Sequence, residues 1–250
     1  MEGNFKSKPF YYRLYGDYAL FTDPVTKGGG EKYTYQIPTY QALKGITEQL
    51  YWKPTLVYYI DSVKVIKKIQ TETKGIRTPM KNGDNDLNYY TYLRDVEYLV
   101  MFHFEWNKNR PDLREDWNEI KHEQILLRSI AKGGRRDLFL GTRECVGYVE
   151  RIKEEQFREA TTYYDGKKIS FGIMFHSFSY PDEAVHNNEC KLISYFTDIK
   201  MDHGKIDFVR PEECQIHHLI RNYDFKSFTR ENMTFAEEEI NSLPKEVETE

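Results

Sequence analysis

The clearest hydrophobic pattern in the chain is the strict alternation over residues 95–106, DVEYLVMFHFEW. Successive side chains of a β-strand point to opposite faces, so an apolar residue at every second position indicates a strand with one face in a core. His103 falls on the other face, where we interpret it as a surface or sheet-pairing residue. The inward positions of this predicted strand are Val96, Tyr98, Val100, Phe102, Phe104 and Trp106.

Over residues 39–53 the apolar residues follow a helical period and do not alternate. Leu43, Ile46 and Leu50 recur three and four positions apart, which places them on one face of a helix. Thr39 stands where a helix N-cap is expected. The segment therefore predicts a helix that packs its leucine and isoleucine face against the core.

A second helix is predicted for residues 116–131. Asp116 and Glu119 have the spacing of a capping box, in which the first side chain binds a free backbone amide of the opening turn. Gly133 and Gly134 follow the segment directly and are typical of a helix C-cap. The glycines therefore end the helix and open a loop.

Three further runs, at residues 10–22, 55–66 and 143–151, are rich in aromatic and β-branched residues and predict strands. With the elements above, the predicted order is strand, helix, strand, strand, helix, strand. This order is typical of a ferredoxin-like or RNA-recognition fold. We therefore predict an α+β chain whose N-terminal domain, residues 1–155, is ferredoxin-like (RRM-like) and carries a glycine-rich loop.

The remainder of the chain has a different pattern. We predict a small C-terminal domain at residues 156–230, a three-stranded antiparallel β-sheet, followed by an acidic tail at residues 231–250. Asp202, His203 and Gly204 form a tight turn between the last two strands. The strand-like runs are residues 166–180, 189–200 and 204–209.

Residues 71–88 are polar and contain Gly, Pro, Asn and Asp without either period, so we predict a long loop. Long loops in compact domains are commonly functional or disordered. Lys74, Arg77 and Lys81 could hold an RNA backbone or form a solvated surface, and the sequence favours neither.

The charge distribution excludes some classes of protein. The formal net charge of −4 argues against a uniformly basic nucleic-acid binder. The tail at 231–250 holds seven Glu and one Lys, so the rest of the chain carries a net charge of +2. Three scattered cysteines fit a reducing compartment without a disulfide framework. No apolar run approaches the ~20 residues of a membrane helix, so we expect a cytoplasmic protein with no membrane partner.

The candidate chemistry gathers in residues 121–145, KHEQILLRSIAKGGRRDLFLGTREC. Lys121 and His122 place a point cation beside a side chain that carries protons near neutral pH. A proton carrier, a cation and an arginine-rich glycine loop together suggest chemistry on phosphate. The sequence shows no zinc spacing and no Walker loop that would compete with this hypothesis. The cations of the segment are Lys121, Arg128, Lys132, Arg135, Arg136 and Arg143.

Tyr51 follows the first predicted helix in the run LYWKP. Lys44, Thr47 and Tyr51 are spaced to share a face away from the core, which would present the tyrosine hydroxyl. From the residues alone, however, we favour a structural role in which Tyr51 and Trp52 seal the end of the helix.

At these residues the sequence resembles a known family, the subtype I-C members of the fifth Cas protein family. This family lies within the RAMP superfamily of CRISPR RNA-binding proteins. The short N-terminal extension, residues 151–160 and the acidic tail match least well. The motifs that carry the resemblance are GDYALFTDP at 16–24, PTYQALKGITEQLYWKP at 38–54, NEIKH at 118–122, GGRRDLFLGTREC at 133–145, FGIMFHSFSYPDE at 171–183 and RPEEC at 210–214.

The resemblance implies a metal-independent endoribonuclease without a cofactor. It would cut repeat hairpins of precursor CRISPR RNA and retain the 5′ handle of the mature crRNA with other subunits of a type I-C interference complex. Without a metal, the expected nucleophile is the 2′-hydroxyl of the RNA, which leaves a 2′,3′-cyclic phosphate. The catalytic residues of the family correspond to Tyr51, Lys121 and His122, which reverses our preference for a structural Tyr51. The residues expected to bind RNA are Lys44, Arg128, Lys132, Gly133, Gly134, Arg135, Arg136 and Arg143.

Two other functions remain open. The chain could be a non-catalytic crRNA-binding subunit, as fifth-family proteins of several other subtypes are, although the retained Tyr51 and Lys-His pair argue against this. It could also be a metal-dependent DNA nuclease, for which Asp84 and Asp86 are weak candidate ligands in a turn-like run.

Overall fold

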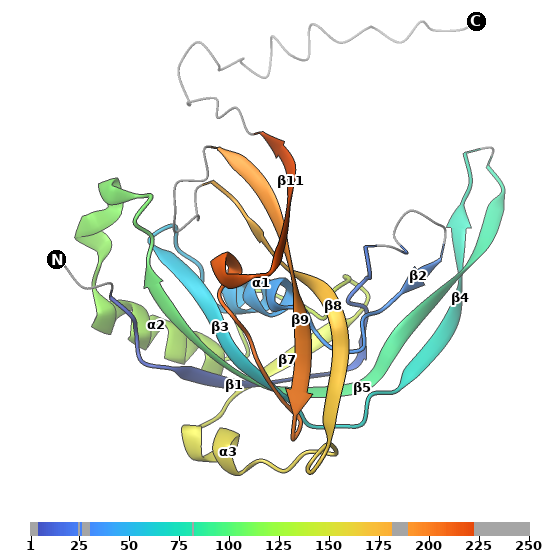
Figure 1. The fold of residues 1–250 in the computed structure, drawn as a ribbon, viewed down its shortest axis with the longest axis horizontal. Helices are drawn as coiled ribbons and strands as arrows, with labels where there is room; N and C mark the ends of the chain where they lie inside the picture. The colour runs from blue at the N-terminus through green and yellow to red at the C-terminus, as the bar shows by residue number, and fades with distance from the viewer. Residues whose placement is uncertain (1–4, 25, 27–30, 82, 182–189, 223–250) are drawn as a thin grey trace, which may run out of the picture.

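The computed structural model describes residues 5–24, 26, 31–81, 83–181 and 190–222 (Figure 1). The predicted acidic tail lies outside the described residues. The described part is a mixed α and β fold, in which one large and mainly antiparallel sheet of eleven strands is accompanied by few helices. Within these residues, no helix has the length and apolar character needed to cross a bilayer.

Four strands and two helices form the centre of the molecule. The strands lie in the order β7-β1-β5-β3, and each neighbouring pair is antiparallel. Helix α1 connects β1 to β3, and helix α2 connects β5 to β7. All six elements agree with the predicted order. Their bounds are β1 Phe10–Ala19, α1 Tyr40–Leu50, β3 Leu56–Val65, β5 Asn85–Trp106, α2 Glu119–Ala131 and β7 Val146–Arg151.

One face of these strands forms the core. Alternate residues of β1 are buried, as the two-residue period of a strand requires. The predicted inward positions of β5 are buried, except for the half-buried Trp106. Leu43, Ile46 and Leu50 on α1 are buried in the same cluster, so the predicted core face of this helix is confirmed.

The two helices begin at different kinds of cap. The hydroxyl of Thr39 accepts a hydrogen bond from the amide of Ala42, so the predicted cap of α1 is confirmed. The predicted capping box at Asp116 is wrong, because the chain there forms a separate 3₁₀-helix, Pro111–Asp116. The side chain of Asn118 instead accepts the amide of Lys121 and caps α2. This change frees the carboxylate of Asp116 for other contacts.

The prediction of a loop at residues 71–88 is wrong. Strand β4 (Thr71–Pro79) pairs antiparallel with the first half of β5, and the two form a hairpin that projects from the central sheet (Figure 1). Most positions of this hairpin are exposed or half-buried, on both faces. Its apolar residues, such as Ile76 and Tyr90, are only partly buried against the core, so the hairpin lacks the apolar alternation by which a strand is recognised in a sequence.

The C-terminal strands continue the same sheet. The three predicted runs correspond to β8, β9 and β10, and His203 and Gly204 have the positive φ angles of a tight hairpin turn. Strand β10 pairs with β3, so backbone hydrogen bonds cross the predicted domain boundary. Strand β11, which pairs with β9, was not predicted. The remaining elements are β2 Lys32–Tyr33, β6 Leu138–Phe139, α3 Glu154–Glu159, β8 Lys168–Ser179, β9 Lys191–Asp202, β10 Lys205–Asp207, the 3₁₀-helix Pro211–Glu213 and β11 Ile216–Asn222.

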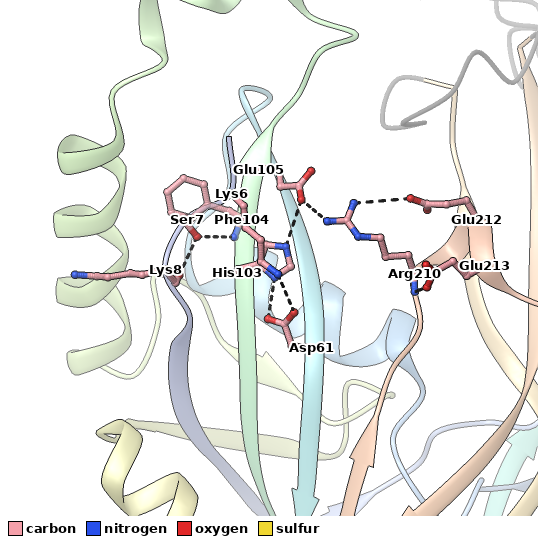
Figure 2. A network of polar contacts seen from close by, with 10 residues as sticks. All are labelled: Lys6, Ser7, Lys8, Asp61, His103, Phe104, Glu105, Arg210, Glu212 and Glu213. Carbon is pink, nitrogen blue, oxygen red and sulfur yellow. Dashed lines mark hydrogen bonds and ion pairs between the residues drawn. The ribbon is translucent and has the colours of Figure 1, made fainter. Parts of the chain in front are cut away.

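A charged cluster fastens the C-terminal segment to the central sheet (Figure 2). The Nδ1 atom of His103 on β5 lies 2.8 Å from Oδ2 of Asp61 on β3. Arg210, which follows β10, forms an ion pair with Glu105 on β5, and its guanidinium lies 4.5 Å from the centre of the Tyr59 ring. His103 is buried beside these side chains, so it pairs within the sheet and is not a surface residue. The start of the RPEEC motif therefore has a structural role.

The stability of the fold is expected to depend on the pH through His176 on β8. This side chain is 1% exposed, and its ring stacks on Tyr40 with centroids 4.3 Å apart. Burial lowers the pKa of the imidazole from 6.5 to about 4. Between these values the unfolded chain binds a proton that the folded chain excludes, so the free energy of unfolding should fall as the pH falls. At about 1.4 kcal/mol per pKa unit, the full loss is roughly 3 kcal/mol.

Urea denaturation at about pH 7 and about pH 5 measures this effect. The variant His176→Phe keeps a ring against Tyr40 but has no proton site, so its stability should depend less on the pH than that of the wild type. The variant His217→Gln, which changes an exposed histidine of β11, should keep the wild-type dependence. Equal dependence in all three proteins would contradict the assignment to His176.

Candidate active site

Two of the predicted catalytic residues meet in the interior. The Oη atom of Tyr51, directly after α1, lies 2.9 Å from Nδ1 of His122 in the first turn of α2. Tyr51 is 1% exposed and His122 is 0% exposed. The hydrogen bond between them is therefore shielded from water, and such shielding strengthens it. Trp52 is exposed, so it does not seal the helix end as one interpretation predicted.

Backbone contacts hold the end of α1 in place. The hydroxyl of Ser129 on α2 donates a hydrogen bond to the carbonyl of Leu50. The hydroxyl of Tyr58 on β3 donates to the carbonyl of Tyr51 at 2.6 Å. The last carbonyls of a helix have no partner within the helix, so these hydroxyls satisfy them and fix the main chain on which the Tyr51 side chain depends.

The partners of His122 determine its tautomer. Its Nε2 atom lies 2.8 Å from the backbone oxygen of Asp116. A carbonyl oxygen only accepts hydrogen bonds, so Nε2 carries a proton. In the neutral imidazole Nδ1 then holds a lone pair, and the hydroxyl of Tyr51 donates to it. Both ring nitrogens are therefore engaged.

Asp116 is a functional candidate that the sequence patterns missed. Its carboxylate forms an ion pair with Lys121, and Oδ2 accepts a hydrogen bond of 2.8 Å from the hydroxyl of Thr55. Oδ2 also lies 3.4 Å from Nε2 of His122. The hydrogen bond from Lys121 is the largest cause that holds the pKa of the Asp116 carboxyl below its ordinary value. In the sequence, only its position shortly before the Lys-His pair could have indicated this role.

Aromatic side chains enclose the imidazole of His122. The ring of Trp106 lies edge-on to it, with centroids 5.7 Å apart, and Trp117 stacks on Trp106 at 6.0 Å. Phe5 stacks on Trp106 at 4.5 Å. Large rigid rings of this kind leave the imidazole little freedom to turn. The relation between His122 and Tyr51 is thus set by packing as well as by hydrogen bonds.

The glycine loop after α2 places an arginine over the ring of Tyr51. Gly133 and Gly134 have φ angles of +80° and +107°, and their amides bond to carbonyls of the last turn, which confirms the predicted C-cap. The guanidinium of Arg135 lies 5.7 Å from the centre of the Tyr51 ring. Arg135 and Arg136 are both exposed, and among the described residues no carboxylate lies within 4.0 Å of either one. Their charges are therefore available to an anion.

The other cations predicted to bind RNA are placed less uniformly. Lys132 and Arg143 are exposed beside the loop residues in sequence. Arg128 is exposed on α2 and donates a hydrogen bond to the carbonyl of Gln124 on the same helix. Lys44 is buried on α1, and its ammonium lies 3.6 Å from Glu48. Of the whole set, Lys44 is therefore the least accessible to RNA.

The carboxylates considered as metal ligands lie elsewhere. Asp84 directly precedes β5 and Asp86 is on it, and both are exposed at the far end of the β4–β5 hairpin. The described residues contain no group of three or more His, Cys, Asp or Glu side chains that could hold a metal ion.

A buried Tyr–His hydrogen bond beside an exposed cationic glycine loop is an arrangement that can carry protons next to a polyanion. Residues 11–209 match the family model Cas_Cas5d, which describes a CRISPR-associated protein (Cas_Cas5). The match covers most of the chain, and the chain belongs to this family of CRISPR-associated proteins.

Known proteins are similar to the chain in sequence and in structure. Proteins of Mannheimia succiniciproducens and Thermus thermophilus, each named CRISPR pre-crRNA endoribonuclease Cas5d, are 27% and 26% identical over 48% and 54% of this chain. In both comparisons the chain spans 61% of the relative's length. A solved structure of a CRISPR-associated protein is 45% identical with a TM-score of 0.74, over 86% of this chain and 98% of that one. A functionally uncharacterized protein from Streptococcus mutans is 48% identical with a TM-score of 0.73, over 86% of this chain and 100% of that one.

Gly45 on α1 and Gly134 in the loop should respond in opposite ways to alanine. A Cβ atom at Gly45 would meet nothing within 4 Å, and alanine favours a helix, so Gly45→Ala should raise the free energy of unfolding by about 0.5–1 kcal/mol. At Gly134 the φ angle is +107°, and a Cβ atom would lie 3.3 Å from the side chain of Leu50. Gly134→Ala should therefore lower the free energy of unfolding by about 1 kcal/mol or more.

Urea denaturation of the two variants beside the wild type measures these changes. A Gly134→Ala variant that is as stable as the wild type, or more stable, would contradict the conformational role assigned to Gly134.

Proposed function

We propose that this chain is an endoribonuclease that cleaves the repeat hairpins of precursor CRISPR RNA and keeps the 5′ handle of the product within a type I-C interference complex. The names of the two curated relatives support this function. The structural observation that carries it is the shielded hydrogen bond between Tyr51 and His122, tied through Asp116 to Lys121 beneath an exposed arginine loop. These side chains supply proton carriers and cations from the chain itself.

The proposed reaction is an in-line attack of a ribose 2′-hydroxyl on the adjacent phosphorus. The bond between the 2′-oxygen and phosphorus forms as the bond to the 5′-oxygen breaks. The 2′-hydroxyl loses its proton and the 5′-oxygen gains one, which yields a 2′,3′-cyclic phosphate and a 5′-hydroxyl. Tyr51 and His122 supply the proton carriers, and Lys121 stabilises the charge that develops on the phosphorane. The nucleophile is already tethered beside the phosphorus, which removes much of the entropic cost.

RNA binding must uncover Tyr51, because the guanidinium of Arg135 lies over its ring. A cation–π contact at an exposed site is worth about 0.5–1 kcal/mol. A hydrogen bond between charged groups contributes about 1.5–3 kcal/mol. A phosphate beside the loop would therefore draw Arg135 away from the ring and open a path to the hydroxyl of Tyr51.

The arrangement of elements supports the same assignment at the level of the fold. The order β1-α1-β3-β5-α2-β7 is that of a ferredoxin-like unit, which we place within residues 1–155. Residues 156–230 would then form the added antiparallel sheet, joined to the first unit through the pairing of β10 with β3.

A non-catalytic crRNA-binding subunit would need the arginine loop but not the shielded hydrogen bond below it. The contacts that Lys121 and His122 make with Asp116 likewise contribute nothing to a site that only holds RNA. The cleaving function therefore accounts for more of the structure.

Loss of a proton carrier or of the ammonium should slow cleavage far more than it weakens binding. With protein in excess, His122→Gln, Tyr51→Phe and Lys121→Ala should each lower the single-turnover rate on a cognate repeat hairpin by about 10²–10⁴-fold. The dissociation constant for the hairpin should change by less than about threefold, because most contacts to RNA are made to phosphates and shape. Gel analysis of the products and a binding titration measure the two quantities.

Two conditions separate this function from its alternatives. A hairpin with deoxyribose on the 5′ side of the scissile phosphate should bind normally and remain uncut, and excess EDTA should leave cleavage of the unmodified hairpin intact. Cutting of the deoxy hairpin, or activity that returns only when a divalent metal is restored, would support a metal-dependent nuclease instead. Tight binding without cutting in any condition would indicate a non-catalytic subunit.

Charge reversal in the arginine loop should weaken binding. Arg135→Glu and Arg136→Glu should lower the affinity for the hairpin and reduce the slope of its log–log salt dependence by about 0.7–0.9 per lost phosphate contact. The variant Lys200→Glu makes the same change of charge at an exposed position of β9 and should bind as the wild type does. If the arginines only stabilise the loop, their variants will melt at a lower temperature while the folded fraction binds RNA normally.

A further inference from the structure

Asp116 connects the buried and the exposed parts of the candidate site. Its side chain is 28% exposed, between Lys121 at 47% and His122 at 0%. It ends the 3₁₀-helix that leads from β5 into α2, so it reaches the first turn of α2 from outside that helix. Thr55, which directly precedes β3, fixes the carboxylate from a third direction with a hydrogen bond of 2.8 Å. Elements on three sides therefore determine where this side chain lies.

The backbone carbonyl of Asp116 determines the direction of proton transfer through His122. Because Nε2 donates to this carbonyl, the only nitrogen of His122 that can take up a proton is Nδ1, which faces Tyr51. The imidazole has no exposed surface and so cannot touch RNA itself. A proton can pass between His122 and the substrate only through the hydroxyl of Tyr51. In this geometry Tyr51 contacts the substrate, and His122 acts through it.

The carboxylate of Asp116 acts on both basic side chains of the site. When Nδ1 takes a proton from Tyr51, the ring becomes a cation whose Nε2–H lies 3.4 Å from Oδ2, and an anion at this position favours the charged ring. The other oxygen, Oδ1, binds the ammonium of Lys121 and ties it to the same carboxylate. Arg135 also brings its charge near the pair, since it faces the ring of Tyr51 from the loop.

We propose that Asp116 is a positioning residue of the cleavage site, which orients a relay from His122 to Tyr51 and holds Lys121 where the scissile phosphate arrives. The assignment rests on the proposed ribonuclease function. It predicts that Asp116 affects the rate of cleavage while it contributes little to RNA affinity, since the carboxylate repels phosphate.

The variant Asp116→Asn tests this role, because it keeps the shape of the side chain and removes the charge. Its single-turnover rate on a bound repeat hairpin should fall by about 10²-fold, and its dissociation constant should stay within about threefold of the wild type. Asp112→Asn is the matched control, since Asp112 is an exposed carboxylate of the same 3₁₀-helix and pairs with Arg110. This control should cleave at the wild-type rate. Asp116→Glu, which keeps the charge, should recover part of the loss.

A double variant separates a positioning role from a general loss of stability. In a His122→Gln background, Asp116→Asn should slow cleavage less than it does in the wild type, because one of the two groups it acts through is already absent. Full additivity of the two losses would overturn the proposal. So would an Asp116→Asn variant that cleaves as fast as Asp112→Asn, or one whose loss of affinity accounts for its whole loss of rate.

The relay can also be tested without cleavage. The ¹⁵N resonances of the His122 ring, assigned by comparison with His122→Gln, report which nitrogen carries the proton in the wild-type protein without RNA. We expect the neutral ring to be protonated on Nε2, and protonation on Nδ1 would overturn the relay. If the wild-type protein cuts no repeat hairpin at all, the proposed function fails, while this spectrum still decides the orientation of His122.

Discussion

The candidate site depends on one buried hydrogen bond, which joins Tyr51 at the end of α1 to His122 at the start of α2. These residues lie 71 positions apart in the chain. The bond exists only because both helices pack on the same face of the central strands β7, β1, β5 and β3. The hydroxyls of Ser129 and Tyr58 bind the carbonyls of Leu50 and Tyr51. The main chain that carries Tyr51 is therefore fixed to the core, and the Tyr51–His122 hydrogen bond is held rigidly. A proton carrier held in this way needs little rearrangement when charge moves.

Burial separates the site into two layers with different tasks. Tyr51 and His122 lie below the surface, where hydrogen bonds are strong and water does not compete. Arg135 lies over the ring of Tyr51, and the exposed Arg135 and Arg136 keep their charges available to an anion, as a polyanionic substrate requires. Asp116 stands between the layers and neutralises Lys121 in the free protein. The local excess of cations therefore lies at the surface of the site, and the buried Tyr51–His122 pair beneath it is neutral.

The rest of the sheet extends this centre in two directions. The long strand β5 extends beyond the core and forms the projecting hairpin with β4, most of whose residues are exposed or half-buried (Figure 1). At the other side, β10 pairs with β3, and the ion pair of Arg210 with Glu105 closes the C-terminal segment over His103 (Figure 2). The face of β3 and β5 that does not carry the helices is thus partly covered by the chain itself.

The sequence by itself determined the elements whose signals are local. The alternation in β5, the apolar face of α1 and the glycine cap of α2 express periods of two and 3.6 residues that the chain carries wherever it folds. The motifs around Tyr51, Lys121 and His122 likewise indicated the family. The β4–β5 hairpin escaped prediction because most of its residues are exposed or only partly buried, so it carries no apolar alternation. Only the tertiary structure decided that Asn118 caps α2, that Asp116 is thereby free to bind Lys121 and His122, and that Lys44 is buried while Arg135 covers Tyr51. The contacts of Asn118 and Asp116 with α2 span only three to six residues, but they follow from where the 3₁₀-helix ends, which no period of the sequence records. The burial of Lys44 and the place of Arg135 over the Tyr51 ring depend on contacts between segments distant in the chain.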